Sequence, residues 1–120
     1  MNNSYILLRH AHSRFSSDDF NRTLSEKGFS SLDQLEFLNS FNIDYYFSSP
    51  YKRAFETVNS SPIQFDKIVL DNRLRERKLS STFIKDSEFE DSIKYLWQNP
   101  SKSLSEGESN QDALARVLIF

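Results

Sequence analysis

The sequence contains no cysteine, only two glycines and three prolines, and no long apolar run. Without cysteine the chain can form neither disulfides nor thiolate metal sites, although the cellular compartment stays open. No apolar stretch approaches the ~18 residues needed to span a bilayer, and the N-terminus lacks the basic flank and apolar core of a signal peptide. We therefore expect a soluble, cytoplasmic protein that does not bind membranes.

Neither sign of charge dominates the chain. Its 120 residues include 15 lysines and arginines and 17 aspartates and glutamates, which gives a net charge of -2. This balance argues against nucleic-acid binding, so any cationic site must be local. A chain of this length suffices for one domain with a modest core, and we expect residues 1–120 to form a single domain.

Chemically active side chains follow an apolar run near the N-terminus. Residues 5–8 are bulky and apolar in succession, and their shortness favours a strand buried on both faces. Arg9, His10 and Ser13 come directly after it, where ligands bind in open parallel sheets. Guanidinium suits phosphate or carboxylate, and imidazole can act as a nucleophile or proton carrier near neutral pH. An Arg-His pair alone, however, is more often a solvated strand end.

A second strand and helix repeat this arrangement. Residues 44–47 favour a strand, and Pro50 suits the first turn of a helix over residues 51–58. Arg53 would then lie in the first helical turn, close to the backbone N–H groups that favour anions. Further predicted elements are a helix capped by Ser25 and continuing to residue 41, a strand at 67–70, a helix at 86–98 and a helix from 109 or 110.

Five short motifs, in this order, resemble the histidine phosphatase superfamily, which includes the cofactor-dependent phosphoglycerate mutases and many small phosphatases. They are Leu7-Leu8-Arg9-His10-Ala11-His12-Ser13, Leu24-Ser25-Glu26-Lys27-Gly28, Ser48-Ser49-Pro50-Tyr51-Lys52-Arg53-Ala54-Phe55-Glu56-Thr57, Leu74-Arg75-Glu76 and Glu106-Gly107-Glu108-Ser109. Their order and spacing are a stronger signal than a lone Arg-His. The resemblance implies an α/β fold with a three-layer, mostly parallel sheet and helices on both of its faces.

The resemblance also implies roles for individual residues. His10 would be the nucleophile and carry a phosphohistidine, Arg9 and Arg53 would neutralise the phosphoryl oxygens, and Ser13 would donate its hydroxyl to phosphate. Glu76 would be the general acid or base, although its basic neighbours favour the charged form of its carboxyl group. A run of charged residues such as 71–78 is also more often a solvated surface. The implied ligand is a small phosphorylated substrate or inorganic phosphate, with no metal or organic cofactor.

Departures from the family pattern favour a phosphatase over a mutase. Ala11 stands where glycine is usual, Ser16 lies near the place of an asparagine that contacts phosphate, and no glycine follows Glu76 at the spacing of the mutases. The alternative to an enzyme is a phosphate-binding or interaction module without turnover. A structural domain whose resemblance is accidental is the third interpretation.

Family members run well beyond this length and bring a second histidine, on a further central strand, into the phosphate pocket. The only other histidine of this chain, His12, belongs to the first motif, so the sequence is expected to be truncated before that strand.

Unpaired strand edges invite association, and we expect a second copy of the chain to cover the gap that the missing strand would leave. Light scattering should therefore detect a homo-oligomer, whereas a clean monomer with a cooperative melt would contradict this prediction.

Overall fold

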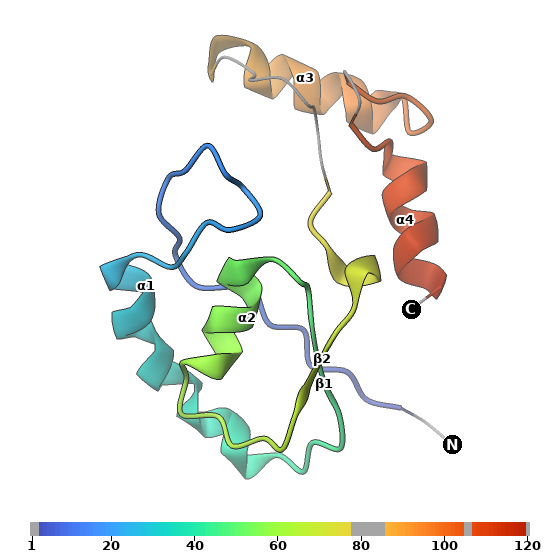
Figure 1. The fold of residues 1–120 in the computed structure, drawn as a ribbon. Coiled ribbons are helices and arrows are strands. Elements are labelled where there is room, and N and C mark those ends of the chain that lie inside the picture. The colour runs from blue at the N-terminus through green and yellow to red at the C-terminus, as the bar shows by residue number, and fades with distance from the viewer. Residues whose placement is uncertain (1–2, 78–85, 105–106, 120) are drawn as a thin grey trace. The chain divides into compact units, whose positions relative to one another are not determined.

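The computed structural model describes residues 3–77, 86–104 and 107–119 of an α/β chain. The chain packs into two compact units, Met1–Asn72 and Arg73–Phe120, which are described separately (Figure 1). The expectation of a single domain stays a prediction. Within the described ranges, no helix combines the length and the apolar character needed to cross a membrane.

The first unit contains a strand–helix–strand crossover. Strand β1, Tyr46–Ser48, pairs in parallel with β2, Ile68–Leu70, and Phe47 lies opposite Val69. Parallel neighbours need a long crossover, which here includes helix α2, Lys52–Asn59. The predicted strands at 44–47 and 67–70 and the predicted helix at 51–58 are confirmed, with ends shifted by one or two residues.

Helix α1, Glu26–Ser31, begins at the predicted cap and continues into a tighter helix. The Ser25 hydroxyl accepts a hydrogen bond from the Gly28 N–H at 3.0 Å, which confirms Ser25 as the N-cap. Residues Leu32–Ser40 follow as the 3-10 helix η1. Burial of its leucines Leu32 and Leu38 fixes this helix against the core.

The prediction of a buried strand at residues 5–8 is wrong. Among the described residues the sheet consists of β1 and β2 alone, and the 5–8 segment takes no part in it. Leu7 is 94% exposed. A strand needs a hydrogen-bonded neighbour, so an apolar run without one stays irregular. The described residues likewise show a two-stranded parallel sheet and not the larger, three-layer sheet that was expected.

The second unit contains a short 3-10 helix and two α-helices. The short 3-10 helix η2, Asn72–Leu74, crosses the boundary between the units, and helices α3, Asp86–Gln98, and α4, Asn110–Ile119, follow. Both predicted helices are confirmed. Leu96 of α3 is buried whereas Trp97 is 74% exposed, so Leu96 is the one that belongs to the apolar face.

A capping box starts α4. The Ser109 N–H donates to Oδ2 of Asp112 at 3.2 Å, and the Asp112 N–H donates to the Ser109 hydroxyl at 3.0 Å. The Ser109 hydrogen bonds lower the pKa of Asp112, because they stabilise its carboxylate. The motif Gly107-Glu108-Ser109 thus ends at the residue that caps α4.

Gly28 lies against the backbone of the first motif, and we predict that Gly28→Ala destabilises the protein. A Cβ at this position would lie 2.1 Å from the carbonyl oxygen of His12, an approach that only glycine permits. The free energy of unfolding in urea should fall by about 2 kcal/mol or more. The matched control Ser30→Ala, exposed in the same helix, should change it by less than about 0.5 kcal/mol. Equal stability of the two variants would contradict the prediction.

Candidate functional site

The imidazole of His10 is half-buried and has a defined orientation. Its Nδ1 lies 2.7 Å from the carbonyl oxygen of Ala11. Because a carbonyl oxygen only accepts hydrogen bonds, Nδ1 must carry the proton in this contact. In the neutral ring the lone pair then belongs to Nε2, which is the atom able to act as nucleophile or base.

The backbone beside His10 is tied to α2 by a single hydroxyl. The Ala11 N–H donates to Oγ1 of Thr57 at 2.9 Å, and the Thr57 hydroxyl donates to the Arg53 carbonyl at 2.7 Å. Thr57 is 2% exposed, so no water competes for either bond. The turn that carries His10 and the helical turn that carries Arg53 are thereby joined.

Arg53 is held on several sides. Its side chain is 2% exposed, and its NH1 donates to the carbonyl oxygen of Asp19 at 2.7 Å. The same NH1 lies 3.3 Å from Oδ1 of Asp19. The guanidinium carbon stands 4.7 Å from the centre of the Tyr51 ring, within cation–π range. The protein itself therefore fixes the position of this guanidinium.

The loop between the first motif and α1 docks on the N-terminus of α2. Its ends are closed by a hydrogen bond from the Arg14 N–H to the Thr23 carbonyl at 2.9 Å. The Phe20 carbonyl accepts the Lys52 N–H at 3.1 Å, and the Phe20 and Tyr51 rings pack edge to face at 5.2 Å. One of the helix N–H groups expected to face an anion is therefore satisfied by the loop.

Glu56 fixes the far end of this loop. Its carboxylate accepts the Thr23 hydroxyl at 2.6 and 2.9 Å and the Leu24 N–H at 3.3 Å. Leu24 is fully buried and forms an isolated antiparallel bridge with Ser13. The third motif, residues 48–57, thus supplies Arg53, Glu56 and Thr57 from one helix, each bonded to a different part of the N-terminal segment.

A local turn shapes the tip of the loop. The Asp18 carboxylate accepts the backbone N–H of Asn21 at 3.2 Å and its side-chain amide at 3.0 Å. These bonds from Asn21 lower the pKa of Asp18, because they stabilise the charged form. The turn is therefore intact at neutral pH, and its contribution disappears only as the pH falls through that lowered pKa.

Arg9, Ser13 and His12 differ in their surroundings. Arg9 is exposed, and its side chain makes no hydrogen bond or ion pair within the part of the chain that the structure describes. Ser13 is half-buried beside Leu24. The Nδ1 of His12 lies 2.7 Å from the Ser25 hydroxyl, at the cap of α1. His12 therefore belongs to the packing of that cap.

Glu76 belongs to the second unit, where an arginine from α4 holds its segment. Arg116 donates from NH1 to the carbonyls of Arg73 at 2.9 Å and Arg75 at 2.7 Å. Arg116 also pairs with Glu108 through two hydrogen bonds, Nε to Oε2 at 3.0 Å and NH2 to Oε1 at 2.8 Å. The Glu76 side chain is exposed on a backbone fixed in this way.

The basic residues around Glu76 have partners of their own. Arg75 lies 3.4 Å from Oε2 of Glu108. Arg77 donates from Nε to the Glu108 carbonyl at 3.2 Å and from NH1 to the side-chain oxygen of Asn110. Lys78, the last of the predicted basic neighbours, lies outside the described residues.

The sequence analysis predicted no role for several residues that hold the proposed site residues in place. Thr57 and Glu56 lie inside the third motif, so the motif itself was the available signal. Asp19 is one of several polar loop residues, and Arg116 follows Glu76 by 40 positions, so neither carried a local signal.

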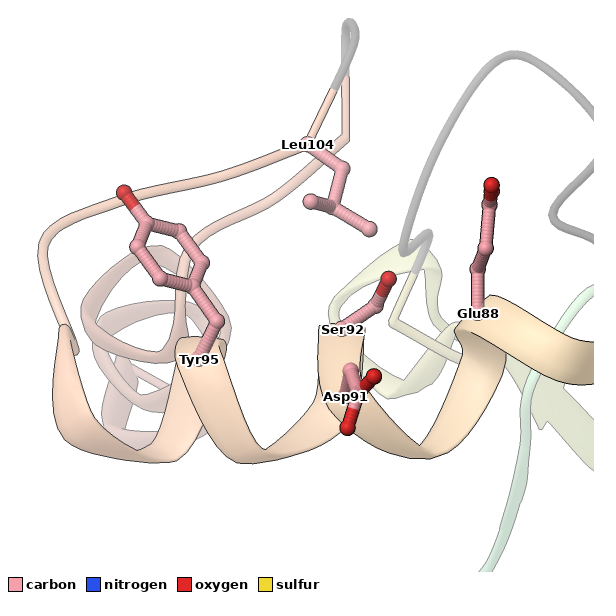
Figure 2. Close-up of a pocket in the computed structure, with 5 residues that line it drawn as sticks. All are labelled: Glu88, Asp91, Ser92, Tyr95 and Leu104. Atoms are coloured by element: carbon pink, nitrogen blue, oxygen red, sulfur yellow. The ribbon is translucent and has the colours of Figure 1, made fainter.

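A separate hollow of about 380 Å³ lies on α3 in the second unit. Figure 2 shows the side chains that line it, which are Glu88, Asp91, Ser92, Tyr95 and Leu104. Its two carboxylates repel a phosphate dianion. None of the predicted site residues lines it.

Comparison with solved structures finds the same fold in mycobacterial enzymes. A mycobacterial glucosyl-3-phosphoglycerate phosphatase, solved with inorganic phosphate, superposes with a TM-score of 0.70 at 19% identity and covers 92% of this chain and 56% of its own. A structure described as mycobacterial hydrolase 1 gives 0.69 at 18% identity, covering 92% and 59%. The chain thus spans little more than half of these relatives. No curated protein matches it significantly by sequence.

A family model supplies the remaining comparison. The model of branch 1 of the histidine phosphatase superfamily matches residues 5–120, which include all the motifs described above. The superposed structures agree with this match at the level of the fold. The chain therefore belongs to the histidine phosphatase superfamily, branch 1.

Proposed function

We propose that this chain hydrolyses a small phosphomonoester through a phosphohistidine on His10, as a phosphatase and not a mutase. The nucleophile is Nε2 of His10, and Arg9, Arg53 and Ser13 bind the phosphoryl oxygens. Glu76 is the acid and base. Family membership and the fold shared with phosphatases support this proposal. The proposal also includes the three-layer, mostly parallel sheet with helices on both faces that the family resemblance implies. We further propose that the protein is cytoplasmic.

The proposed reaction has two steps. His10 Nε2 attacks phosphorus, the bond from phosphorus to the ester oxygen breaks, and Glu76 gives that oxygen a proton. The Glu76 carboxylate then takes a proton from water, whose oxygen attacks the phosphohistidine and releases inorganic phosphate and neutral His10. Arg9 and Arg53 neutralise charge on the non-bridging oxygens in both steps, which is where most catalysis of phosphoryl transfer originates.

The observation that carries the proposal is the pair of hydrogen bonds that the Thr57 hydroxyl makes, one with the Ala11 N–H and one with the Arg53 carbonyl. Phosphoryl transfer depends on positioning, and a nucleophile must be held at a fixed place relative to the cation that binds the phosphoryl group. The two hydrogen bonds of Thr57, at 2.9 and 2.7 Å, connect the backbones of these groups through a buried atom. The Nδ1–H contact of His10 supports Nε2 as the attacking atom.

A second candidate is a phosphate-binding module without turnover. It is favoured by the fixed position of Arg53, which is 2% exposed and donates to the Asp19 carbonyl, because a cation held in place can bind an anion without catalysing its transfer. Binding of phosphate or vanadate without hydrolysis would select this function over the first. The proposed partners are the same in both, a phosphorylated small molecule or phosphate, with a second copy of the chain.

We predict that His10→Ala abolishes turnover of a generic aryl phosphate, by at least about a thousandfold, because it removes the nucleophile. The wild-type chain incubated with substrate and quenched in base should carry an acid-labile phosphate that the variant lacks. His12→Gln is the matched control, because glutamine can still bond the Ser25 hydroxyl at the α1 cap. Turnover that survives in His10→Ala, or that a chelator abolishes, would exclude the proposed chemistry.

We predict that Thr57→Val lowers kcat about tenfold or more, because the His10 turn loses its attachment to the Arg53 helix. Valine has the same shape but no hydroxyl, so the partly buried Ala11 N–H loses its acceptor, at a cost of about 1 kcal/mol or more in unfolding free energy. Thr57→Ser keeps the hydroxyl and should retain most of kcat. If the valine and serine variants had the same kcat and melting temperature, the role given to this hydroxyl would be wrong.

A further inference from the structure

The carboxylate of Asp19 lies between two guanidinium groups. Its Oδ1 is 3.3 Å from NH1 of Arg53 and 3.6 Å from NH2 of Arg22. The two arginines come from different elements, α2 and the end of the loop that precedes α1. An oxygen anion held between two cations is the arrangement that a phosphoryl oxygen would also adopt.

The surroundings of this carboxylate are unequal in burial. The Asp19 side chain is 60% exposed, whereas the Arg53 side chain is 2% exposed and that of Arg22 is 24% exposed. The Nε of Arg22 is buried and has no hydrogen-bond partner among the described residues. The carboxylate therefore leaves the Nε of Arg22 without an acceptor, and a group with more oxygens could supply one.

We propose that Asp19 is an internal competitor for the anion at Arg53, and that phosphate binds by displacing its carboxylate. This inference rests on the proposed function, because it takes Arg53 to be a phosphate ligand. Asp19 then sets the affinity of the site: it holds Arg53 in place when no ligand is bound and disfavours weakly charged anions. A phosphate dianion, with twice the charge and more oxygens, replaces it.

Displacing the Asp19 carboxylate from Arg53 should cost little free energy. A partly exposed ion pair contributes little free energy, because water screens it and the side chain loses freedom in forming it. The backbone contact from Arg53 to the Asp19 carbonyl, at 2.7 Å, does not depend on the side chain and can remain when the carboxylate leaves. The Asp18 turn and the contact of Phe20 with Lys52 also stay, so the loop keeps its place.

The test compares phosphate affinity in Asp19→Asn and wild type by isothermal titration calorimetry with inorganic phosphate at low ionic strength. Asparagine keeps the shape and the backbone carbonyl but removes the charge. Loss of the two screened ion pairs, with Arg53 and with Arg22, should tighten phosphate binding about three- to fivefold. Asp44→Asn, an exposed aspartate on the amino-terminal side of β1, makes the same change in net charge and should leave the affinity at the wild-type value.

The outcomes separate this inference from the proposed function. If Asp19→Asn binds phosphate no more tightly than Asp44→Asn, or more weakly, Asp19 does not compete and the inference is overturned while the phosphate site stands. If neither wild type nor Asp19→Asn binds phosphate, both fail. Binding by Asp19→Asn alone would support the inference most strongly. Asp19→Ser serves as a second uncharged variant should Asp19→Asn unfold, and it should tighten binding by a similar factor.

Discussion

The hydroxyl of Thr57 is the constraint on which the first unit depends. The N-terminal segment is not held by a sheet, because residues 5–8 make no ladder bonds. It is fixed by hydrogen bonds to neighbouring elements, and the one nearest His10 runs from the Ala11 N–H to Thr57. The same hydroxyl donates a hydrogen bond to the Arg53 carbonyl. A buried group with one acceptor and one donor contact thus determines where the histidine turn lies relative to α2.

The loop of residues 14–23 supplies hydrogen-bond acceptors to polar groups of helix α2. It supplies the Phe20 carbonyl to the N-terminus of α2, and Asp19 supplies both a carbonyl and a carboxylate to Arg53. A buried guanidinium without such acceptors would be strongly destabilising. The loop therefore supplies the acceptors that Arg53 needs once its guanidinium is buried.

The second unit uses a related device. Arg116 directs one nitrogen to the carbonyls of Arg73 and Arg75 and the other two nitrogens to Glu108. The backbone beside Glu76 is therefore fixed by hydrogen bonds from Arg116 of α4, whose guanidinium is itself held by its ion pair with Glu108. In both units a helical side chain satisfies the backbone of an irregular segment that carries a proposed catalytic group, which holds the segment without regular secondary structure.

The sequence by itself determined the features that depend on near neighbours. The Ser25 cap, the helix over Asp86–Gln98 and the start of α4 were predictable, because caps and amphipathic spacing act within a few residues. The motifs also identified the family. Only the tertiary structure decided that residues 5–8 lack strand partners, that Thr57 joins Ala11 to Arg53, and that Asp19 pairs with Arg53. These outcomes depend on partners 34 to 46 residues apart or on a neighbouring strand, and no local pattern encodes which distant group satisfies a given donor.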